Sequence, residues 1–333
     1  MLTISDIAQK AQVSRTLVSR VLNNKSGVSP ENRAKILAII EENHYVPSGL
    51  ARSLVMQKTQ TIGVVMDDLC NSYFFDLISG IQDAGEKLGY NILFCNGHST
   101  METKMKYVDY FSQGRTDGMI AYGSDLENEP LFLNMASKTS CFVLIEGQLS
   151  SKNINNIQLD NYTGAYKATT HLIKLGYHNI LHFTGDMNYN VSLERLNGFV
   201  QAMHDNNMPI QANTIVYADY FEKIAYQQMN QLLNDGHRPD ACFFGADKAA
   251  FGAIRAIYEH HLRIPEDIAI IGFDDDVPDS RDMIFPNLTT MQQPLYDMGK
   301  TSVELLVNSI ENPNAEPQTK IFEPKFIIRD TCR

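Results

Sequence analysis

Apolar residues at the start of the chain recur with the spacing of short amphipathic helices. Ser5 is expected to cap a first helix over residues 6–11, and Ser14 a second over 15–23. A third helix is expected from Pro30, which suits a first helical turn, to about residue 43. The expected inward faces comprise Ile7, Ala8 and Ala11, then Leu17, Val18, Val21 and Leu22, then Ile36, Leu37, Ile39 and Ile40. Three short helices with a tight turn after the first predict a helix-turn-helix headpiece.

From residue 61 the pattern changes to alternating strands and helices. The expected strands cover 61–66, 91–95, 118–121, 141–145, 157–159, 180–184, 214–217, 241–245 and 268–273. The expected helices cover 73–88, 101–113, 131–137, 162–175, 193–206, 222–234 and 248–260. Repeated strand–helix units predict parallel sheets with helices on both faces, and the restart near residue 180 predicts two lobes. The fold class is therefore an α/β two-lobed core behind an all-α headpiece, with a ligand cleft expected between the lobes.

Charge is divided unevenly along the chain. The 333 residues suffice for two or three domains, and the net charge of −11 is unlike that of a nucleic-acid binder. Residues 1–60, however, hold eight Lys or Arg against four Asp or Glu, a net charge of +4 that leaves −15 for the remainder. This asymmetry indicates a basic, nucleic-acid-binding N-terminal part.

Other function classes find no support in the composition. The five cysteines are widely spaced without a Cys-x-x-Cys pair, which favours buried reduced thiols over a disulfide framework or a zinc site. No apolar run is long enough to cross a membrane, and Asp6 and Lys10 interrupt a signal peptide, so a soluble cytoplasmic protein is expected. The histidines form no metal motif, and no hydrolase, phosphate-loop or dinucleotide motif occurs. We therefore expect no enzyme activity, no cofactor and no metal.

The second helix carries the chemistry of a DNA-reading element. In helix-turn-helix modules the first residues of this helix meet base edges in the major groove. Arg15 could form a forked pair with guanine, Thr16 could contact a thymine methyl group, and Arg20 lies one turn further along. The alternative is that all three only face solvent.

These residues belong to a pattern that resembles the headpiece of the lactose-repressor (LacI/GalR) family. The matching segments are Ile4-Ser5-Asp6-Ile7-Ala8, Val13-Ser14, Val18-Ser19-Arg20-Val21-Leu22-Asn23, Tyr45-x-Pro47 and Ala51-Arg52-Ser53-Leu54. Leu17 and Ser48 depart from it, where the family usually has threonine and asparagine. The DNA contacts expected on this basis are Ser5, Arg15, Thr16, Ser19, Arg20, Asn23, Tyr45, Ala51 and Leu54.

The segment 49–54 matches that family's hinge and is too short to be a stable helix alone in water. It could order against DNA and a second hinge, and the resemblance gives Leu54 the role of a wedge between base pairs in the minor groove. The alternative is a plain linker.

The remaining chain resembles the periplasmic-binding-protein-like core of the same family. The matching segments are Asp68-x-x-Asn71-x-Tyr73-Phe74, Asp160-Asn161, Arg195-x-x-Gly198-Phe199, Asp247-x-x-Ala250-x-Gly252 and Ile271-Gly272-Phe273-Asp274-Asp275. The resemblance implies effector contacts from Asn71, Tyr73, Phe74, Glu146, Arg195, Tyr220 and Asp274. A carboxylate at Asp274 can accept two hydroxyl hydrogen bonds, and Arg195 can donate others. Core packing is the alternative for Phe74, and helix capping or loop bonding is the alternative for Asp274.

The expected domains are a headpiece at 1–46, a hinge at 47–60 and an effector-binding and dimerisation core at 61–333. The first lobe is expected at about 61–160 and 290–322, and the second at 161–289 and 323–333. The expected function is a homodimeric repressor of a carbohydrate-utilisation operon that binds a near-palindromic operator under control of a sugar-like effector.

Three alternatives remain open at this point. The effector could be a purine, although Tyr189 and Val191 stand where purine binders of the family have arginine and threonine. A phosphorylated carrier protein could act as corepressor. Outside this class, the chain could be a solute-binding protein without a regulatory role.

Overall fold

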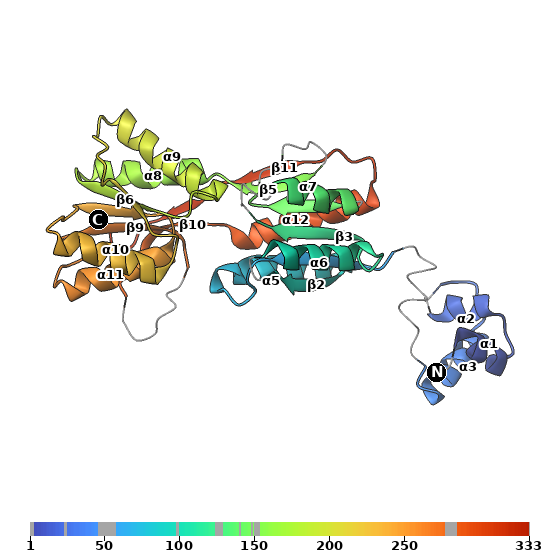
Figure 1. The fold of residues 1–333 in the computed structure, drawn as a ribbon. Coiled ribbons are helices and arrows are strands. Elements are labelled where there is room, and N and C mark those ends of the chain that lie inside the picture. The colour runs from blue at the N-terminus through green and yellow to red at the C-terminus, as the bar shows by residue number, and fades with distance from the viewer. Residues whose placement is uncertain are drawn as a thin grey trace. The chain divides into compact units, whose positions relative to one another are not determined.

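The structure is a computed structural model that divides into two compact units, residues 1–60 and 61–333 (Figure 1). The residues that it describes are 3–22, 25–45, 58–97, 100–123, 129–139, 141–147, 149, 154–276 and 285–332. The predicted contact residues Asn23, Ala51 and Leu54 lie outside the described residues. The hinge and its boundary with the headpiece therefore stay predictions.

Three helices form the first unit, as the apolar spacing predicts. They are α1 (Ile4–Ala11), α2 (Arg15–Leu22) and α3 (Pro30–Glu42). The cap predicted for the first helix was wrong, because α1 starts earlier and Thr3 caps it. Thr3 and Asp6 form a reciprocal capping box, which leaves Ser5 exposed inside the first turn. The cap of α2 is confirmed, since the Ser14 hydroxyl accepts from the Leu17 backbone N–H at 3.2 Å.

The headpiece has its own small core of buried side chains from all three helices. The buried members are Ile7, Ala8, Ala11, Val18, Val21 and Ile36. The prediction for Leu37 was wrong, because its side chain is 48% exposed. Leu37 directly follows Ile36 in α3, so its side chain points away from the face of the helix on which Ile36 is buried.

The first lobe of the second unit is a six-stranded parallel sheet with the order β11-β5-β4-β3-β1-β2. Its strands are β1 (Thr61–Met66), β2 (Asn91–Asn96), β3 (Gly118–Tyr122), β4 (Phe142–Ile145), β5 (Asn155–Leu159) and β11 (Thr319–Phe322). Its helices are η1 (Ser72–Phe74), α5 (Phe75–Leu88), α6 (Met101–Ser112), α7 (Glu129–Lys138) and α12 (Leu295–Glu311). Helix α5 packs with α12 and helix α6 with α7, which gives the sheet two covered faces.

The second lobe repeats this plan with the strand order β12-β10-β9-β8-β6-β7. Its strands are β6 (Ile180–Thr184), β7 (Ile215–Tyr217), β8 (Ala241–Phe244), β9 (Ala269–Asp274), β10 (Thr289–Gln292) and β12 (Lys325–Ile327). Its helices are α8 (Asn161–Lys174), α9 (Asn190–Asp205), α10 (Glu222–Asn234) and α11 (Asp247–Glu259). The expectation of purely parallel sheets fails at one edge, because β12 runs antiparallel to β10.

The structure places one boundary between the two lobes later in the chain than predicted. Strand β10 pairs with β9, so the second lobe extends past residue 289 and the chain returns to the first lobe only after residue 292.

Among the cysteines, Cys70 is exposed and Cys95 half-buried, so the prediction of buried thiols holds only for the other three. Within the described residues no helix is long and apolar enough to cross a membrane.

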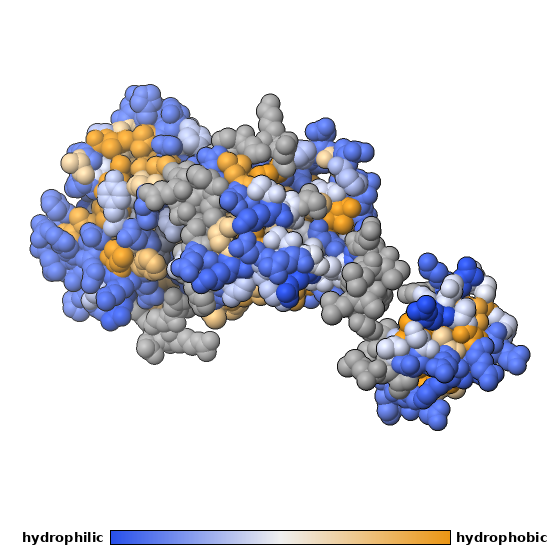
Figure 2. Space-filling view, turned by 45° about the vertical axis from the view of Figure 1, so that its right-hand side comes forward, coloured by the Kyte–Doolittle hydropathy of each residue, from blue (hydrophilic) through white to orange (hydrophobic). Residues whose placement is uncertain are grey.

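Apolar side chains fill the space between each sheet and its helices. One buried cluster lies against α10 and α11, another against α6 and α7, and a third draws on both lobes. Hydrophilic residues cover most of the visible surface, with apolar patches between them (Figure 2). Some of the buried polar residues, among them Glu146, Thr184 and Gln293, lie at or directly after the ends of strands, where the candidate site lies.

Candidate DNA-binding surface and effector site

Helix α2 presents the predicted reading residues on its outer side. Arg15, Thr16 and Arg20 are exposed, and Ser19 is half-buried. Positions one turn apart share a helix side, so Arg15 and Ser19, like Thr16 and Arg20, are neighbours. The side chain of Arg20 also reaches back to Gly27, where an added Cβ would stand 2.6 Å from Nη1.

Other predicted contacts hold the headpiece together. Tyr45 is half-buried and packs against the headpiece core, and its N–H donates to the carbonyl of Ile40 at 2.9 Å. The ammonium group of Lys10 donates to the amide oxygen of Asn43, which ties α1 to the end of α3. This basic side chain of the headpiece thus has a structural partner.

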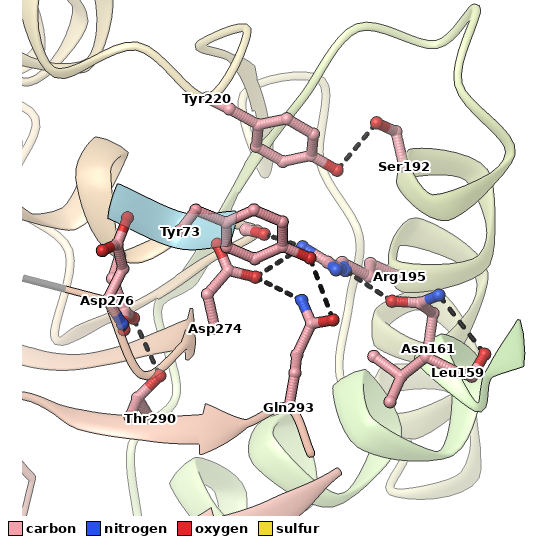
Figure 3. A network of polar contacts seen from close by, with 12 residues as sticks. Tyr73, Leu159, Asn161, Ser192, Arg195, Tyr220, Asp274, Asp276, Thr290 and Gln293 are labelled. Atoms are coloured by element: carbon pink, nitrogen blue, oxygen red, sulfur yellow. Dashed lines mark hydrogen bonds and ion pairs between the residues drawn. The ribbon is translucent and has the colours of Figure 1, made fainter. Parts of the chain in front are cut away.

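The predicted effector residues of the second unit meet where strands of both lobes end. Asp274 is the last residue of β9, and its Oδ1 accepts from the amide of Gln293 at 2.7 Å. The amide oxygen of Gln293 in turn accepts from the Tyr73 hydroxyl, 3.0 Å away and part of the first lobe (Figure 3). A continuous polar chain therefore joins the two lobes.

Arg195 is the cation at the centre of this chain. Its guanidinium is buried, lies 3.4 Å from Asp274 Oδ1 and donates through Nε to Asn161 Oδ1 at 2.8 Å. It also donates to the carbonyl of Gly245 and stacks 3.8 Å above the ring centre of Phe273. Burial raises the pKa of Asp274, against the opposing effects of Arg195 and the Gln293 amide. The geometry fixes a planar donor beside a carboxylate, a pair suited to a ligand with several hydroxyl or amide groups.

Glu146 follows strand β4 and is buried, with 4% of its surface exposed. Its Oε2 lies 3.5 Å from the amide nitrogen of Asn161, which also reaches Glu194 Oε2 at 3.4 Å. Its Oε1 finds no hydrogen-bond partner among the described residues. Burial raises the pKa of Glu146 to about 7, and Arg195 only partly offsets this effect. Near neutral pH this group can therefore either accept or donate a proton.

Tyr220 supplies an aromatic wall on the second lobe. Its hydroxyl is 2.7 Å from the Ser192 hydroxyl at the start of α9 (Figure 3). Its ring lies against Gly185, which directly follows β6. An added Cβ on Gly185 would stand 2.2 Å from this ring, so glycine is required for the close approach. The ring is thereby held in one place beside Arg195, whose guanidinium carbon is 5.8 Å from the ring centre.

Comparison with known proteins connects both units to one family. Residues 3–48 match the model described as bacterial regulatory proteins, lacI family, and residues 169–332 match the periplasmic binding protein-like domain. The transcriptional repressor PurR of Yersinia pestis (strain Pestoides F) is 33% identical over 330 residues, 99% of this chain and 96% of that protein. The chain belongs to the LacI family.

Solved structures of relatives agree with this assignment. The lac repressor dimer bound to operator and the anti-inducer ONPF superposes with a TM-score of 0.87 at 26% identity, covering 99% of this chain and 98% of that one. A LacI family regulator from Enterococcus faecium with bound ribose gives 0.70 at 27% identity, covering 82% and 98%. The protein is a DNA-binding transcriptional regulator with the two-lobed fold and helix-turn-helix region of its family.

Two residues implied by the family resemblance also have partners within the chain. Phe74 is buried in the core, edge-on to the rings of Tyr73 and Tyr122, which is the packing role that the sequence left open. Asn71 accepts through Oδ1 from the Tyr73 backbone N–H and from the ammonium of Lys248, so it caps η1 and bridges the lobes.

Sequence reasoning missed four members of the network, Gln293, Asn161, Ser192 and Tyr122. The Tyr122 hydroxyl is 3.4 Å from that of Tyr73, and the other three bond as described above. One of them, Asn161, stands in the Asp160-Asn161 segment that matches the family. The place of this segment directly after the predicted strand 157–159 was the signal that could have found it. No group of three or more His, Cys, Asp or Glu is placed to hold a metal within the described ranges.

Proposed function

We propose that this regulator binds a near-palindromic operator as a homodimer and that a small, hydroxyl-rich effector between its lobes controls operator affinity. A carbohydrate is the effector class that the site favours, which makes the protein a repressor of carbohydrate-utilisation genes. The site residues proposed are Asn71, Tyr73, Phe74, Glu146, Arg195, Tyr220 and Asp274, with Gln293 and Asn161 added. The DNA contacts proposed are Ser5, Arg15, Thr16, Ser19, Arg20, Asn23, Tyr45, Ala51 and Leu54.

The observation that carries the proposal is the polar chain from Tyr73 through Gln293 and Asp274 to Arg195. It offers fixed donors and acceptors from both lobes, with the Tyr220 ring beside them. Sugars present hydroxyl groups that both donate and accept, together with flat apolar faces that pack on aromatic rings. A ligand that contacts both lobes binds one of their arrangements more tightly and so shifts the population between them.

A purine is the second candidate, because the Yersinia pestis relative of 33% identity is a repressor named PurR. The positions in question start helix α9, where Tyr189 precedes the helix without a side-chain cap and Val191 is apolar. The Val191 side chain cannot hydrogen-bond to a base edge, and the Tyr189 phenol cannot reproduce the forked donors of arginine. The carbohydrate hypothesis therefore fits this site better.

The experiment is a thermal-shift screen of the full chain with sugars, sugar phosphates and purines, followed by operator binding with the ligands that stabilise it. Cleft ligands raise the melting temperature by mass action. We expect a sugar to stabilise the chain and to change operator affinity. Stabilisation by hypoxanthine or guanine, without response to any sugar, would establish the purine alternative.

Asp274→Asn tests the site itself. Loss of a charge-assisted acceptor should weaken effector binding by about tenfold to a hundredfold, roughly 1.5–3 kcal/mol, while operator binding is retained. The matched control is Asp267→Asn, a carboxylate of the same lobe that pairs with Arg238 and Arg263. The control should keep its full effector response. An Asp274→Asn chain that melts earlier but responds normally would show that Asp274 only supports the fold.

A further inference from the structure

A second set of interlobe contacts lies beside the proposed effector contacts and shares only Asn71 with them. It joins Asn71 and Ser72 of the first lobe to Lys248 and Asp276 of the second. The Lys248 ammonium donates to Asn71 Oδ1 at 3.0 Å, and the Ser72 hydroxyl donates to Asp276 Oδ1 at 3.1 Å. Lys248 is also 3.9 Å from Asp276 Oδ2, so the four side chains close a ring that crosses the gap between lobes.

The second-lobe half of this ring is held rigidly by its own lobe. The backbone N–H of Asp276 donates to Asp247 Oδ2 at 2.9 Å, and Asp247 Oδ1 accepts from the Thr290 hydroxyl at 2.8 Å. Asp247 is buried against Gly272, where an added Cβ would stand 1.9 Å from Oδ1. Elements α11, β9 and β10 therefore jointly position Asp276, and Lys248 follows Asp247 directly in the chain.

The first-lobe half is equally well defined. Asn71 caps η1 through the Tyr73 N–H at 3.2 Å, and Ser72 is the first residue of that short helix. The next residue, Tyr73, belongs to the proposed effector site. A movement that breaks the ring must therefore shift the residue adjoining Tyr73.

The ring is also shielded from water. The Asp276 side chain is 4% exposed and that of Lys248 is 21% exposed. Hydrogen bonds to charged groups are stronger than neutral ones, and shielding reduces their screening. Contacts of this kind can hold two lobes in one arrangement before any ligand arrives.

We infer that Asn71, Ser72, Lys248 and Asp276 form a latch that holds the lobes closed without effector and thereby sets the basal operator affinity. The second part of this inference rests on the proposed function, and the first part does not. An effector that changes operator affinity must then favour an arrangement in which the latch is broken, because a ligand that bound only the arrangement already populated would shift nothing. Loss of the latch should therefore strengthen effector binding.

The test measures the distance between the lobes in the ligand-free full chain. Glu86 on α5 and Lys223 on α10, which are both exposed, are each replaced by a genetically encoded amino acid that carries a spin label. This labelling does not use cysteine, so the native cysteines remain. Labelled chains are diluted with unlabelled chains, so that distances within one protomer dominate. The latch variant combines Ser72→Ala with Lys248→Met. The matched control combines Ser79→Ala with Lys138→Met, whose partners Phe75 and Asp109 lie in the first lobe.

We expect one distance population in the wild type and in the control. The latch variant should show a second population, with the ratio of closed to open chains changed by about tenfold or more. A distance distribution equal to that of the wild type would overturn the latch. Operator affinity without ligand is measured on the same proteins and should change in the latch variant only. A changed distance distribution with unchanged operator affinity would leave the latch standing and overturn its regulatory role.

Discussion

Glu146 offers a test in which the direction and the size of the effect both follow from burial. Its side chain is 4% exposed, and burial raises its pKa from the ordinary 4.5 to about 7. Between these two pH values the unfolded chain releases a proton that the folded chain retains. Stability contributed by this group is therefore lost as pH rises from about 4.5 to about 7.

The size of the loss comes from the shift itself. A shift of about 2.5 pKa units at 1.36 kcal/mol each corresponds to about 3 kcal/mol above pH 7. Glu146→Gln keeps the shape of the side chain and removes the titration. Part of this loss is already complete at pH 5, so we expect the variant to gain about 2.5 kcal/mol relative to the wild type between pH 5 and pH 8. The altered hydrogen bond with Asn161 adds only an offset that is the same at all pH values.

The assay is urea denaturation of the full chain, followed by far-ultraviolet circular dichroism at pH 5, 6, 7 and 8. The control is Glu323→Gln, whose carboxylate is 70% exposed beside Lys167, and its difference from the wild type should stay flat over this range. A flat difference for Glu146→Gln as well would refute the reasoning. It would mean that water or a rearranged partner solvates the carboxylate in the folded state.

Two further substitutions test the headpiece and the second lobe. Arg15→Ala should lower operator affinity by about 1–3 kcal/mol and relax base preference in a binding-site selection. Lys10→Ala should weaken binding to all DNA sequences alike. It should also lower the melting temperature of the headpiece, because Asn43 loses the hydrogen bond from Lys10. A uniform loss for Arg15→Ala would contradict its assignment to a base. Gly272→Ala should destabilise the chain by about 1–3 kcal/mol in the same urea assay, because the new Cβ would press on the buried carboxylate of Asp247. Unchanged stability would show that this carboxylate can move.

The regular elements of the fold could be predicted from the sequence where apolar residues repeat with a clear period. Strands such as β1 and β8 are short apolar runs between helices of mixed pattern, and buried strands of parallel sheets have this composition. The sequence did not reveal β10 and β11, which are four residues long and read Thr-Thr-Met-Gln and Thr-Lys-Ile-Phe. Strand β11 is an exposed edge strand, so little burial marks it in the sequence.

The site could be predicted only as far as single side chains carry a chemical signal. A carboxylate at the end of an apolar strand, as at Asp274, stands out in the sequence. The amides that complete the network do not, because their partners lie far along the chain: Gln293 bonds to Tyr73, 220 positions away, and Asn161 to Arg195, 34 positions away. Asn71 shows the same limit, since its bond to Lys248 joins residues 177 positions apart. Pairings across lobes depend on tertiary geometry, which local pattern does not encode.

Backbone conformation adds an independent reason to place function at the ends of these strands. Glu146, Tyr220 and Asp274 have φ values of 65°, 62° and 118°, in the left-handed region that favours glycine. Each such conformation costs on the order of 1–3 kcal/mol in a non-glycine residue and persists only where the surroundings enforce it. A glycine at these positions would relieve the strain but would remove a carboxylate or an aromatic ring. The chain keeps the side chain and bears the strain at three of the seven predicted effector residues, which supports the proposed effector site.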